Sequence, residues 1–250
     1  MKTSTAPGQK INLVLVVPCF NEAHRLQEKR FLHFLKTHAH CAFIFVDDGS
    51  TDNTTQVLAT LAASNPKAIF VLTQKKNQGK AAAVRAGILK AKEWNPKKVG
   101  YLDADLAISP EECYRLSTFV KAETDFVFGS RIKLIDNHIE RKWYRFLIGR
   151  FIATLISKML GLPVYDTQCG GKVFTTSLGV SLFEKPFISR WLFDVELFFR
   201  ALKIYGKVGF VEKSKEIPVR QWIDTADSKV PLTYGFWLWF DLLKIYNTYR

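Results

Sequence analysis

The chain has 250 residues, of which 48% are hydrophobic, and a formal net charge of +13. This composition suffices for one sizeable core and excludes a largely disordered protein, apart from a polar N-terminus (1–10) that we expect to be flexible. The strong positive charge predicts an anionic partner: a nucleic acid, an anionic membrane face or a phosphorylated substrate. The longest apolar runs are interrupted by charges, so no membrane span is expected. The four cysteines lack metal-ligand spacing and no secretion signal is visible, which favours the cytoplasm.

Strands and helices alternate through residues 11–135. Apolar, β-branched runs predict buried strands at 11–17, 42–46, 68–72, 99–102 and 126–128. Helices are expected between them, at 23–36, 53–63, 79–92 and from Pro110 onward, with Asp52 able to cap the second. This order is typical of an α/β fold with a mainly parallel central sheet flanked by helices.

Residues 136–250 follow a different pattern. Apolar residues at helical spacing predict helices at 139–160, 191–205 and 232–249, with a strand or hairpin at 208–217. The first of these helices has basic residues opposite its apolar face, and the last is rich in aromatic residues. We therefore expect C-terminal amphipathic helices that face a membrane, although packing of either helix on the sheet would explain the same pattern.

Acidic pairs follow two of the predicted strands at the points where they end. The carboxyl ends of parallel strands share one edge of a sheet, where ligands bind. Asp103-Ala104-Asp105 follows the strand at 99–102, and two carboxylates one residue apart can share Mg²⁺ or Mn²⁺ with a diphosphate. Asp47 and Asp48 follow the second strand, where a carboxylate can accept hydrogen bonds from a nucleobase and a ribose.

Two further strand ends carry groups suited to a nucleotide. In the segment 18–22, Phe20 can stack on a base and Glu22 can bind a ribose. The segment 77–80 ends in glycine and lysine, which suit a phosphate at a helix N-terminus. Each loop alone also fits an ordinary turn or helix cap, but four of them at one sheet edge favour a nucleotide site. The sequence has no GxGxxG dinucleotide fingerprint, P-loop or zinc pattern.

Together these motifs resemble those of the family 2 glycosyltransferases, which have the GT-A fold. The matching segments are PCFNE (18–22), VDDGSTD (46–52), NQGKAAAVRAG (77–87), DADL (103–106), GSR (129–131), DTQCGGKVF (166–174), RWLFDVELFF (190–199), IPVRQW (217–222) and DSKVP (227–231). The set is similar to that of the dolichyl-phosphate β-glucosyltransferases and nearly as similar to that of the polyprenyl-phosphate mannosyltransferases. It departs from these patterns at Ala107 and Gly171, which leaves the donor sugar open.

The resemblance implies an inverting, metal-dependent enzyme that transfers a hexose, in the first place glucose from UDP-glucose, to a polyprenyl or dolichyl phosphate. It implies that residues 11–135 bind the nucleotide sugar and residues 136–250 bind the acceptor and meet the membrane, within one domain. An ionised phosphate acceptor needs no general base, whereas for a hydroxyl acceptor the candidates are Asp194 and Glu196.

The implied residues fall into four groups. They are, for catalysis, Asp103, Asp105 and Arg131; for the metal, Asp103 and Asp105; for the donor, Pro18, Phe20, Glu22, Asp47, Asp48, Lys80, Asp103, Ala104 and Asp105; and for the acceptor, Arg131, Arg141, Arg145, Gln168, Asp194 and Lys229, with Asp166 and Glu196 shaping that side.

The expected partners are a nucleotide-sugar donor, a lipid phosphate and a membrane surface, with the protein peripheral at the cytoplasmic face. A separate membrane protein or a homo-oligomer is left open. The alternatives are a GDP-mannose-dependent mannosyltransferase, a basic nucleic-acid-binding module and a non-catalytic subunit with the same fold. No nucleic-acid-binding motif is visible, so we expect no nucleic acid. The intact pair of Asp103 and Asp105 argues against a non-catalytic subunit.

Overall fold

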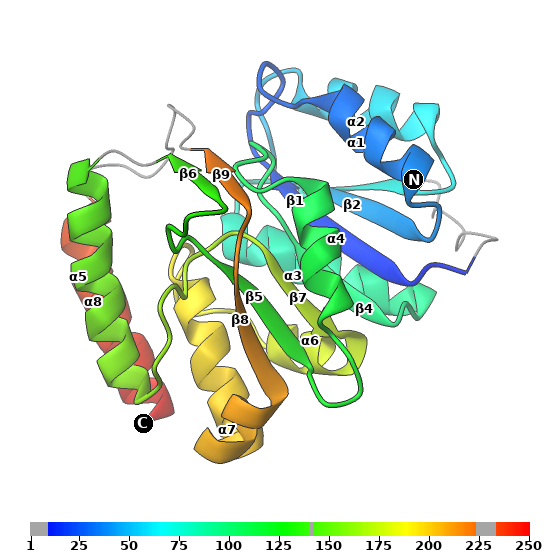
Figure 1. The fold of residues 1–250 in the computed structure, drawn as a ribbon. Coiled ribbons are helices and arrows are strands. Elements are labelled where there is room, and N and C mark those ends of the chain that lie inside the picture. The colour runs from blue at the N-terminus through cyan, green and yellow to red at the C-terminus, as the bar shows by residue number, and fades with distance from the viewer. Residues whose placement is uncertain (1–9, 141–142, 224–233) are drawn as a thin grey trace.

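A seven-stranded sheet forms the centre of the computed structural model, which describes residues 10–140, 143–223 and 234–250 (Figure 1). The strand order is β3-β2-β1-β4-β7-β5-β8. All of these strands run in the same direction except β7, which is antiparallel to both of its neighbours. The strands are β1 (Leu13–Cys19), β2 (Cys41–Asp47), β3 (Ile69–Thr73), β4 (Lys98–Tyr101), β5 (Phe126–Ser130), β7 (Lys172–Thr175) and β8 (Ser214–Pro218).

Helices cover both faces of the sheet, so the core has two layers, one on each face. Alternate residues of one strand enter different layers: Leu13 and Leu15 pack with one set of helices, and Val14 and Val16 pack with the other. Burial on both faces is why the central strands are almost continuously apolar. The first set is α1 (Glu28–Thr37), α2 (Thr54–Ser64) and α4 (Pro110–Thr118), and the second is α3 (Lys80–Ala91), α6 (Thr176–Phe183) and α7 (Phe193–Lys213), with a short 3-10 turn, η1 (Lys92–Trp94), after α3.

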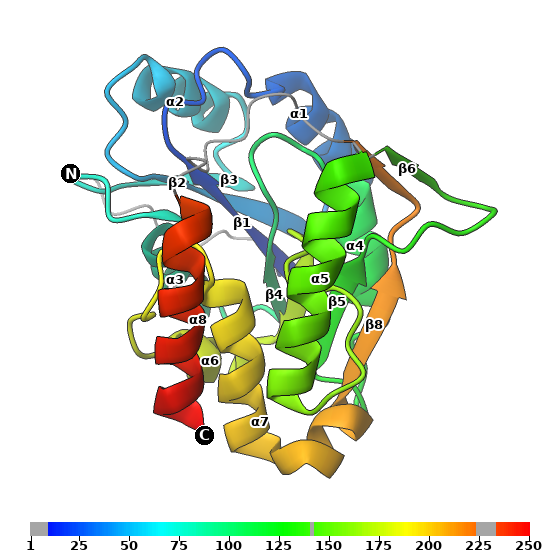
Figure 2. The ribbon, with the colours of Figure 1, turned by 90° about the vertical axis from the view of Figure 1, so that its left-hand side faces the viewer.

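Two more helices, α5 (Trp143–Leu160) and α8 (Tyr234–Tyr249), pack against α7 on its outer side (Figure 2). Their inward residues, such as Ile156 of α5 and Ile245 of α8, are fully buried in the second core layer. A separate two-stranded parallel ladder joins β6 (His138–Glu140) to β9 (Gln221–Ile223). The ladder lies beside the sheet edge at which the parallel strands end (Figure 1).

The predicted α/β fold with a mainly parallel sheet is confirmed. In the first half, every predicted strand and helix forms close to its expected bounds, except that α1 begins five residues later than predicted. The residues before α1 are held instead by side chains at the start of α2 and in the loop before it: Thr54 accepts a hydrogen bond from the backbone N–H of Glu22, and Asp52 accepts one from the N–H of Ala23.

In the second half, the helix expected at 139–160 forms with a later start, and the strand or hairpin expected at 208–217 was wrong for residues 208–213. The helix expected at 139–160 begins only at Trp143, because residues 138–140 pair with β9. The strand expected at 208–217 is helical up to Lys213, with a bend at Gly206, where φ is 67°, and only 214–218 form a strand. A short apolar run does not by itself distinguish a strand from a helix.

Candidate active site

The loops after β1 and β2 are joined into one unit by side-chain hydrogen bonds. Ser50 Oγ accepts from the backbone N–H of Asn21 at 3.0 Å, and Asn21 Oδ1 accepts from the N–H of Thr51 at 2.8 Å. Glu22 is only 6% exposed, and its carboxylate forms two hydrogen bonds with Arg25. The predicted roles of Pro18, Phe20 and Glu22 toward a nucleoside stay predictions, with Pro18 and Phe20 half-buried at this edge.

Asp47 and Asp48 connect the end of β2 to its neighbouring loops. The two oxygens of Asp48 accept from the backbone N–H groups of Gln78 and Gly79, at 2.8 and 2.7 Å. Burial raises the pKa of Asp48 in spite of these bonds, which lower it. Asp47 is fully buried and accepts from the N–H of Ser50. Both carboxylates thus shape the loops, and their contact with a nucleoside stays a prediction.

The acidic pair after β4 meets a lysine at this edge. Lys80 Nζ lies 2.5 Å from Asp103 Oδ1. Burial and the nearby charge of Asp105 raise the pKa of Asp103 in spite of Lys80, whose ammonium lowers it. Burial alone would lower the pKa of Lys80, but the carboxylates of Asp103, Asp194 and Asp105 outweigh it and raise the pKa. The structure therefore brings together three of the predicted donor residues.

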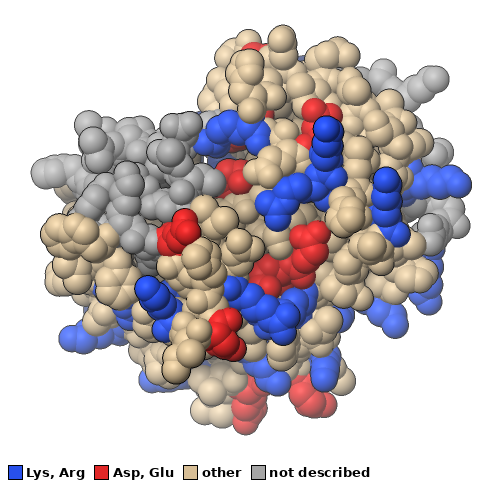
Figure 3. All heavy atoms as spheres, turned by 45° about the horizontal axis from the view of Figure 1, so that its top comes forward, with Lys and Arg blue, Asp and Glu red and all other residues tan. Residues whose placement is uncertain are grey.

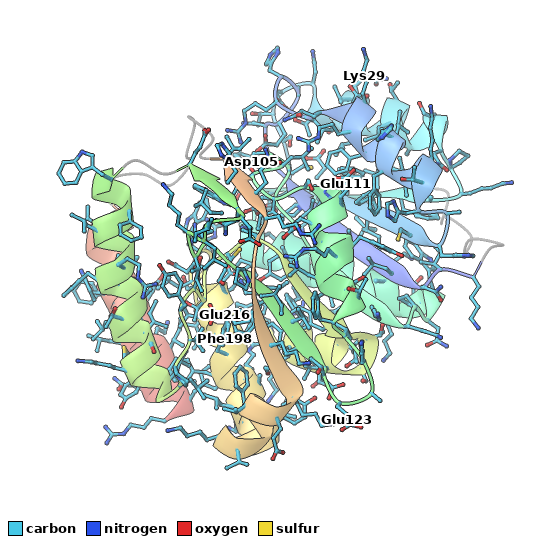
Figure 4. The ribbon with its side chains drawn as sticks, in the orientation of Figure 1. Lys29, Asp105, Glu111, Glu123, Phe198 and Glu216 are labelled. Carbon is cyan, nitrogen blue, oxygen red and sulfur yellow. The ribbon has the colours of Figure 1, made fainter. Side chains whose placement is uncertain are left out.

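The backbone fixes this acidic pair from two sides. The N–H of Ala107 donates to Asp105 Oδ1, and Leu106 between them has a left-handed φ of 55°. Gly170 lies against the other side: a Cβ there would be 2.6 Å from Asp103 Oδ2, so only glycine fits without displacement. Figure 4 labels Asp105 on the upper side of the sheet, and Figure 3 shows acidic side chains at the centre of this face with basic side chains around them.

Asp194 lies behind the acidic pair and is only 5% exposed. Its Oδ1 accepts from Tyr101 Oη and from Lys172 Nζ, each at 2.5 Å. Lys172 has no exposed surface and also donates to the carbonyl of Cys169, next to Gly170. Burial and the charge of Asp194 raise the pKa of Tyr101 well above its usual value. Asp194 therefore belongs to a buried network beside the acidic pair, and its predicted role toward the acceptor stays a prediction.

Arg131 and Asp166 form a second buried pair, between the end of β5 and the loop before β7. Arg131 donates from Nε and Nη2 to the two oxygens of Asp166, at 2.6 and 2.9 Å. Burial would raise the pKa of Asp166, but Arg131 lowers it to about 2. The Arg131 guanidinium also lies 5.4 Å from the centre of the Trp222 ring. Its orientation is thus fixed by protein groups, and its role toward an acceptor stays a prediction.

The remaining predicted acceptor residues are spread more widely. Gln168 is exposed, and its backbone N–H donates to Asp166. Arg141, Lys229 and the side chain of Arg145 lie outside the described part of the chain.

Glu196 is held in the interior by three partners. It has no exposed surface, and its oxygens accept from Arg200, from Tyr249 Oη and from the N–H of Ile188. Glu196 thus forms a buried ion pair with Arg200, and its predicted role on the acceptor side stays a prediction.

Three residues of the site were not predicted from the sequence: Tyr101, Lys172 and Arg190. Lys172 is detectable in principle, because it is a single charge at the start of an apolar strand. Arg190 donates to the carbonyls of Gln78 and Asn77, in a loop more than 100 residues earlier in the chain. No sequence pattern predicts that contact.

Comparison with known proteins agrees with this geometry. The profile described as Glycosyl transferase family 2 matches residues 14–178. The chain is 31% identical to a dolichyl-phosphate beta-glucosyltransferase of Trichomonas vaginalis, over 96% of this chain and 72% of that protein. It is 30% identical to the dolichyl-phosphate beta-glucosyltransferase of Homo sapiens, over 93% of this chain and 72% of that protein.

Solved structures with low sequence identity share the fold. One is glucosyl-3-phosphoglycerate synthase from Mycobacterium tuberculosis in complex with UDP, with a TM-score of 0.63 and 17% identity over 95% of this chain and 80% of that chain. Another is mannosyl-3-phosphoglycerate synthase from Rubrobacter xylanophilus, with a TM-score of 0.65 and 19% identity over 94% of this chain and 72% of that chain. The predicted GT-A fold is confirmed. The chain belongs to glycosyl transferase family 2 and is a glycosyltransferase.

Proposed function

We propose that this glycosyltransferase moves glucose from UDP-glucose, with inversion, to a polyprenyl or dolichyl phosphate at the cytoplasmic face of a membrane. The observation that carries the proposal is the group of Lys80, Asp103 and Asp105 at the end of β4, in a chain that matches dolichyl-phosphate beta-glucosyltransferases over most of its length. We assign donor binding to residues 11–135, which contain this group, and acceptor binding to residues 136–250.

Asp103 and Asp105 fit a divalent cation. Their carboxylates lie close enough for the charge of Asp105 to raise the pKa of Asp103, which is a repulsion that a shared cation would relieve. Carboxylate oxygens suit Mg²⁺ and Mn²⁺. Among the described residues no cluster of three or more His, Cys, Asp or Glu side chains could hold a metal, so the donor diphosphate and water would complete the coordination. When bound, the cation would neutralise charge on the departing diphosphate.

The arrangement of charges suits an acceptor that is already ionised. Lys80 places an ammonium group beside Asp103, where it can donate to a diphosphate oxygen as negative charge develops on the leaving group. Neither candidate base is free at the surface, since Asp194 is held by Tyr101 and Lys172 and Glu196 is fully buried. A phosphate acceptor attacks as an anion and requires no base. This favours a lipid phosphate over a sugar hydroxyl as the acceptor.

The outer helices supply a surface for membrane contact. On α5, Leu147, Ile148 and Phe151 are 56%, 60% and 69% exposed, and on α8 Phe240 and Leu243 are 57% and 55% exposed. Exposed apolar side chains in such number are typical of interaction surfaces. No described helix is both long enough and apolar enough to cross a bilayer. We therefore assign α5 and α8 to the membrane interface, with their inward halves packed on α7.

The basic face predicted for α5 is only partly available. Arg150 donates to the carbonyl of Tyr165, and its guanidinium lies 3.6 Å from the centre of that ring. Its charge is thus directed toward the loop before β7 and away from the outer surface. Membrane contact through α5 would accordingly rest on apolar side chains more than on this arginine.

The test is donor turnover with the two nucleotide sugars in parallel. The protein is incubated with Mn²⁺ or Mg²⁺, a short polyprenyl phosphate and either UDP-glucose or GDP-mannose, and the released nucleotide is measured. We expect UDP release that requires both metal and lipid phosphate and is lost in Asp103→Asn. Release of GDP only would keep the mechanism and move the donor to mannose. No release from either donor would contradict the proposed function.

A further inference from the structure

Residues 77–79 lie between two opposite charges on different elements. On one side the Asp48 carboxylate, after β2, accepts from the N–H groups of Gln78 and Gly79. On the other side the Arg190 guanidinium donates from Nε to the carbonyl of Gln78 at 3.0 Å and from Nη2 to that of Asn77 at 3.1 Å. A planar guanidinium suits two acceptors at once, because its N–H groups have fixed directions.

The position of Gly79 shows how closely the arginine approaches this segment. Gly79 has a φ of 96°, and a Cβ at this position would be 3.1 Å from Arg190 side-chain atoms. The backbone carbonyl of Arg190 also accepts from the N–H of Ala81, in the first turn of α3. These contacts therefore hold the backbone in one conformation where the segment enters α3, whose first residue is Lys80.

The backbone on either side of Arg190 is held by hydrogen bonds. Ser189 Oγ accepts from the N–H groups of Trp191 and Leu192 and donates to Asp241 of α8 at 2.6 Å. The N–H of Ile188 donates to buried Glu196. Arg190 itself is exposed, so its own substitution removes little buried surface and should leave the fold intact.

We propose that Arg190 is a positioning residue for the donor: it fixes residues 77–79 so that the Lys80 ammonium keeps its ion pair with Asp103. This inference rests on the proposed function, because Lys80 and Asp103 are assigned there to the donor diphosphate. Only a fixed backbone keeps a long lysine side chain in one place, and displacement of a catalytic group by about 1 Å can cost roughly 100-fold in rate. Arg190 acts through Lys80, without a required contact of its own with the sugar nucleotide.

The test is a double-mutant cycle on nucleotide binding, with Arg190→Gln, Lys80→Met and the double variant. Binding of UDP with Mn²⁺ is measured by calorimetry, and UDP-glucose turnover is measured in parallel. We expect Arg190→Gln to weaken UDP binding about 10-fold in the wild-type background and less than about 2-fold beside Lys80→Met, because the two changes remove one effect. Arg190→Lys, which keeps the charge without the planar donor pair, should recover only part of the affinity.

The matched control is Arg85→Gln on α3, where the arginine donates to the carbonyl of Glu184, which lies outside residues 77–79. It should bind UDP like the wild type. The positioning role would be overturned by additive losses in the cycle, by full recovery in Arg190→Lys, or by equal losses in Arg190→Gln and Arg85→Gln. In each of these cases, normal turnover by the wild-type protein would leave the proposed function standing. A wild-type protein that neither binds UDP or GDP nor releases them would overturn both.

Discussion

Replacing Gly170 by alanine should damage the site without damaging the fold. The added Cβ would lie 2.6 Å from Asp103 Oδ2, whereas contacts of real Cβ atoms essentially never fall below 3.0 Å. The carboxylate must therefore move by about half an ångström or more, and its other oxygen is the one that pairs with Lys80. A displacement of this size predicts a loss of roughly 10- to 100-fold in turnover and a higher Mn²⁺ concentration for half-maximal activity. Because only the end of one half-exposed side chain has to move, the melting temperature should stay within about 3 °C, the shift that about 1 kcal/mol produces in a chain of this size.

The assay is UDP-glucose turnover over a Mn²⁺ titration, with thermal unfolding followed by circular dichroism. Gly171→Ala is the control, because its Cβ would meet the side-chain ends of Ile108 and Leu116 at 3.3 Å and not a carboxylate. Equal losses in both variants would show that any methyl group in this loop is harmful. Normal turnover and normal metal dependence in Gly170→Ala would refute the assigned position of Asp103.

Three further changes test other parts of the structure. Asp166→Asn should lower the free energy of unfolding by about 2 kcal/mol at pH 7, because the pKa of Asp166 falls from 3.8 to about 2 on folding. That contribution is complete above about pH 4 and is lost as the pH falls through 2, so urea unfolding should show the gap to wild type narrowing in acid, and a constant gap would contradict the assignment. Glu196→Gln should cost about 3 kcal/mol by breaking a buried ion pair, whereas normal thermal unfolding with lost turnover would identify Glu196 as a base after all. Leu147→Glu combined with Phe151→Glu should reduce sedimentation with anionic phospholipid vesicles, while Ile204→Glu on α7 should not, and equal binding by all three proteins would remove the membrane assignment.

The sequence predicted those residues of the site that lie in loops at the ends of parallel strands. Asp103 and Asp105 follow a buried strand, and Lys80 opens a helix after another, so their meeting at one sheet edge follows from the parallel pairing that links β3, β2, β1 and β4. The prediction was less successful where a strand enters the sheet in the opposite direction. Strand β7 enters the sheet antiparallel between β4 and β5, and it carries Lys172 into the interior behind Asp103. An inserted strand of this kind has no local signature that gives its direction.

The same limit applies to the acidic residues of the second half. Asp194 and Glu196 are two positions apart at the start of α7, and both were equally available as bases from the sequence. Their different partners, Lys172 and Tyr101 for one and Arg200 and Tyr249 for the other, come from distant segments. Which carboxylate is neutralised by which cation depends on distances across the core.

By itself, the sequence determined the fold class, the order of strands and helices in the first half and the family, because hydrophobic periodicity and short motifs are local properties of the chain. Only the tertiary structure decided which polar groups meet. It pairs Arg131 with Asp166, encloses residues 77–79 between Asp48 and Arg190, and turns Leu147 and Phe151 outward. These outcomes depend on hydrogen bonds and burial between residues far apart in the chain, and such energies exist only once the layers have packed.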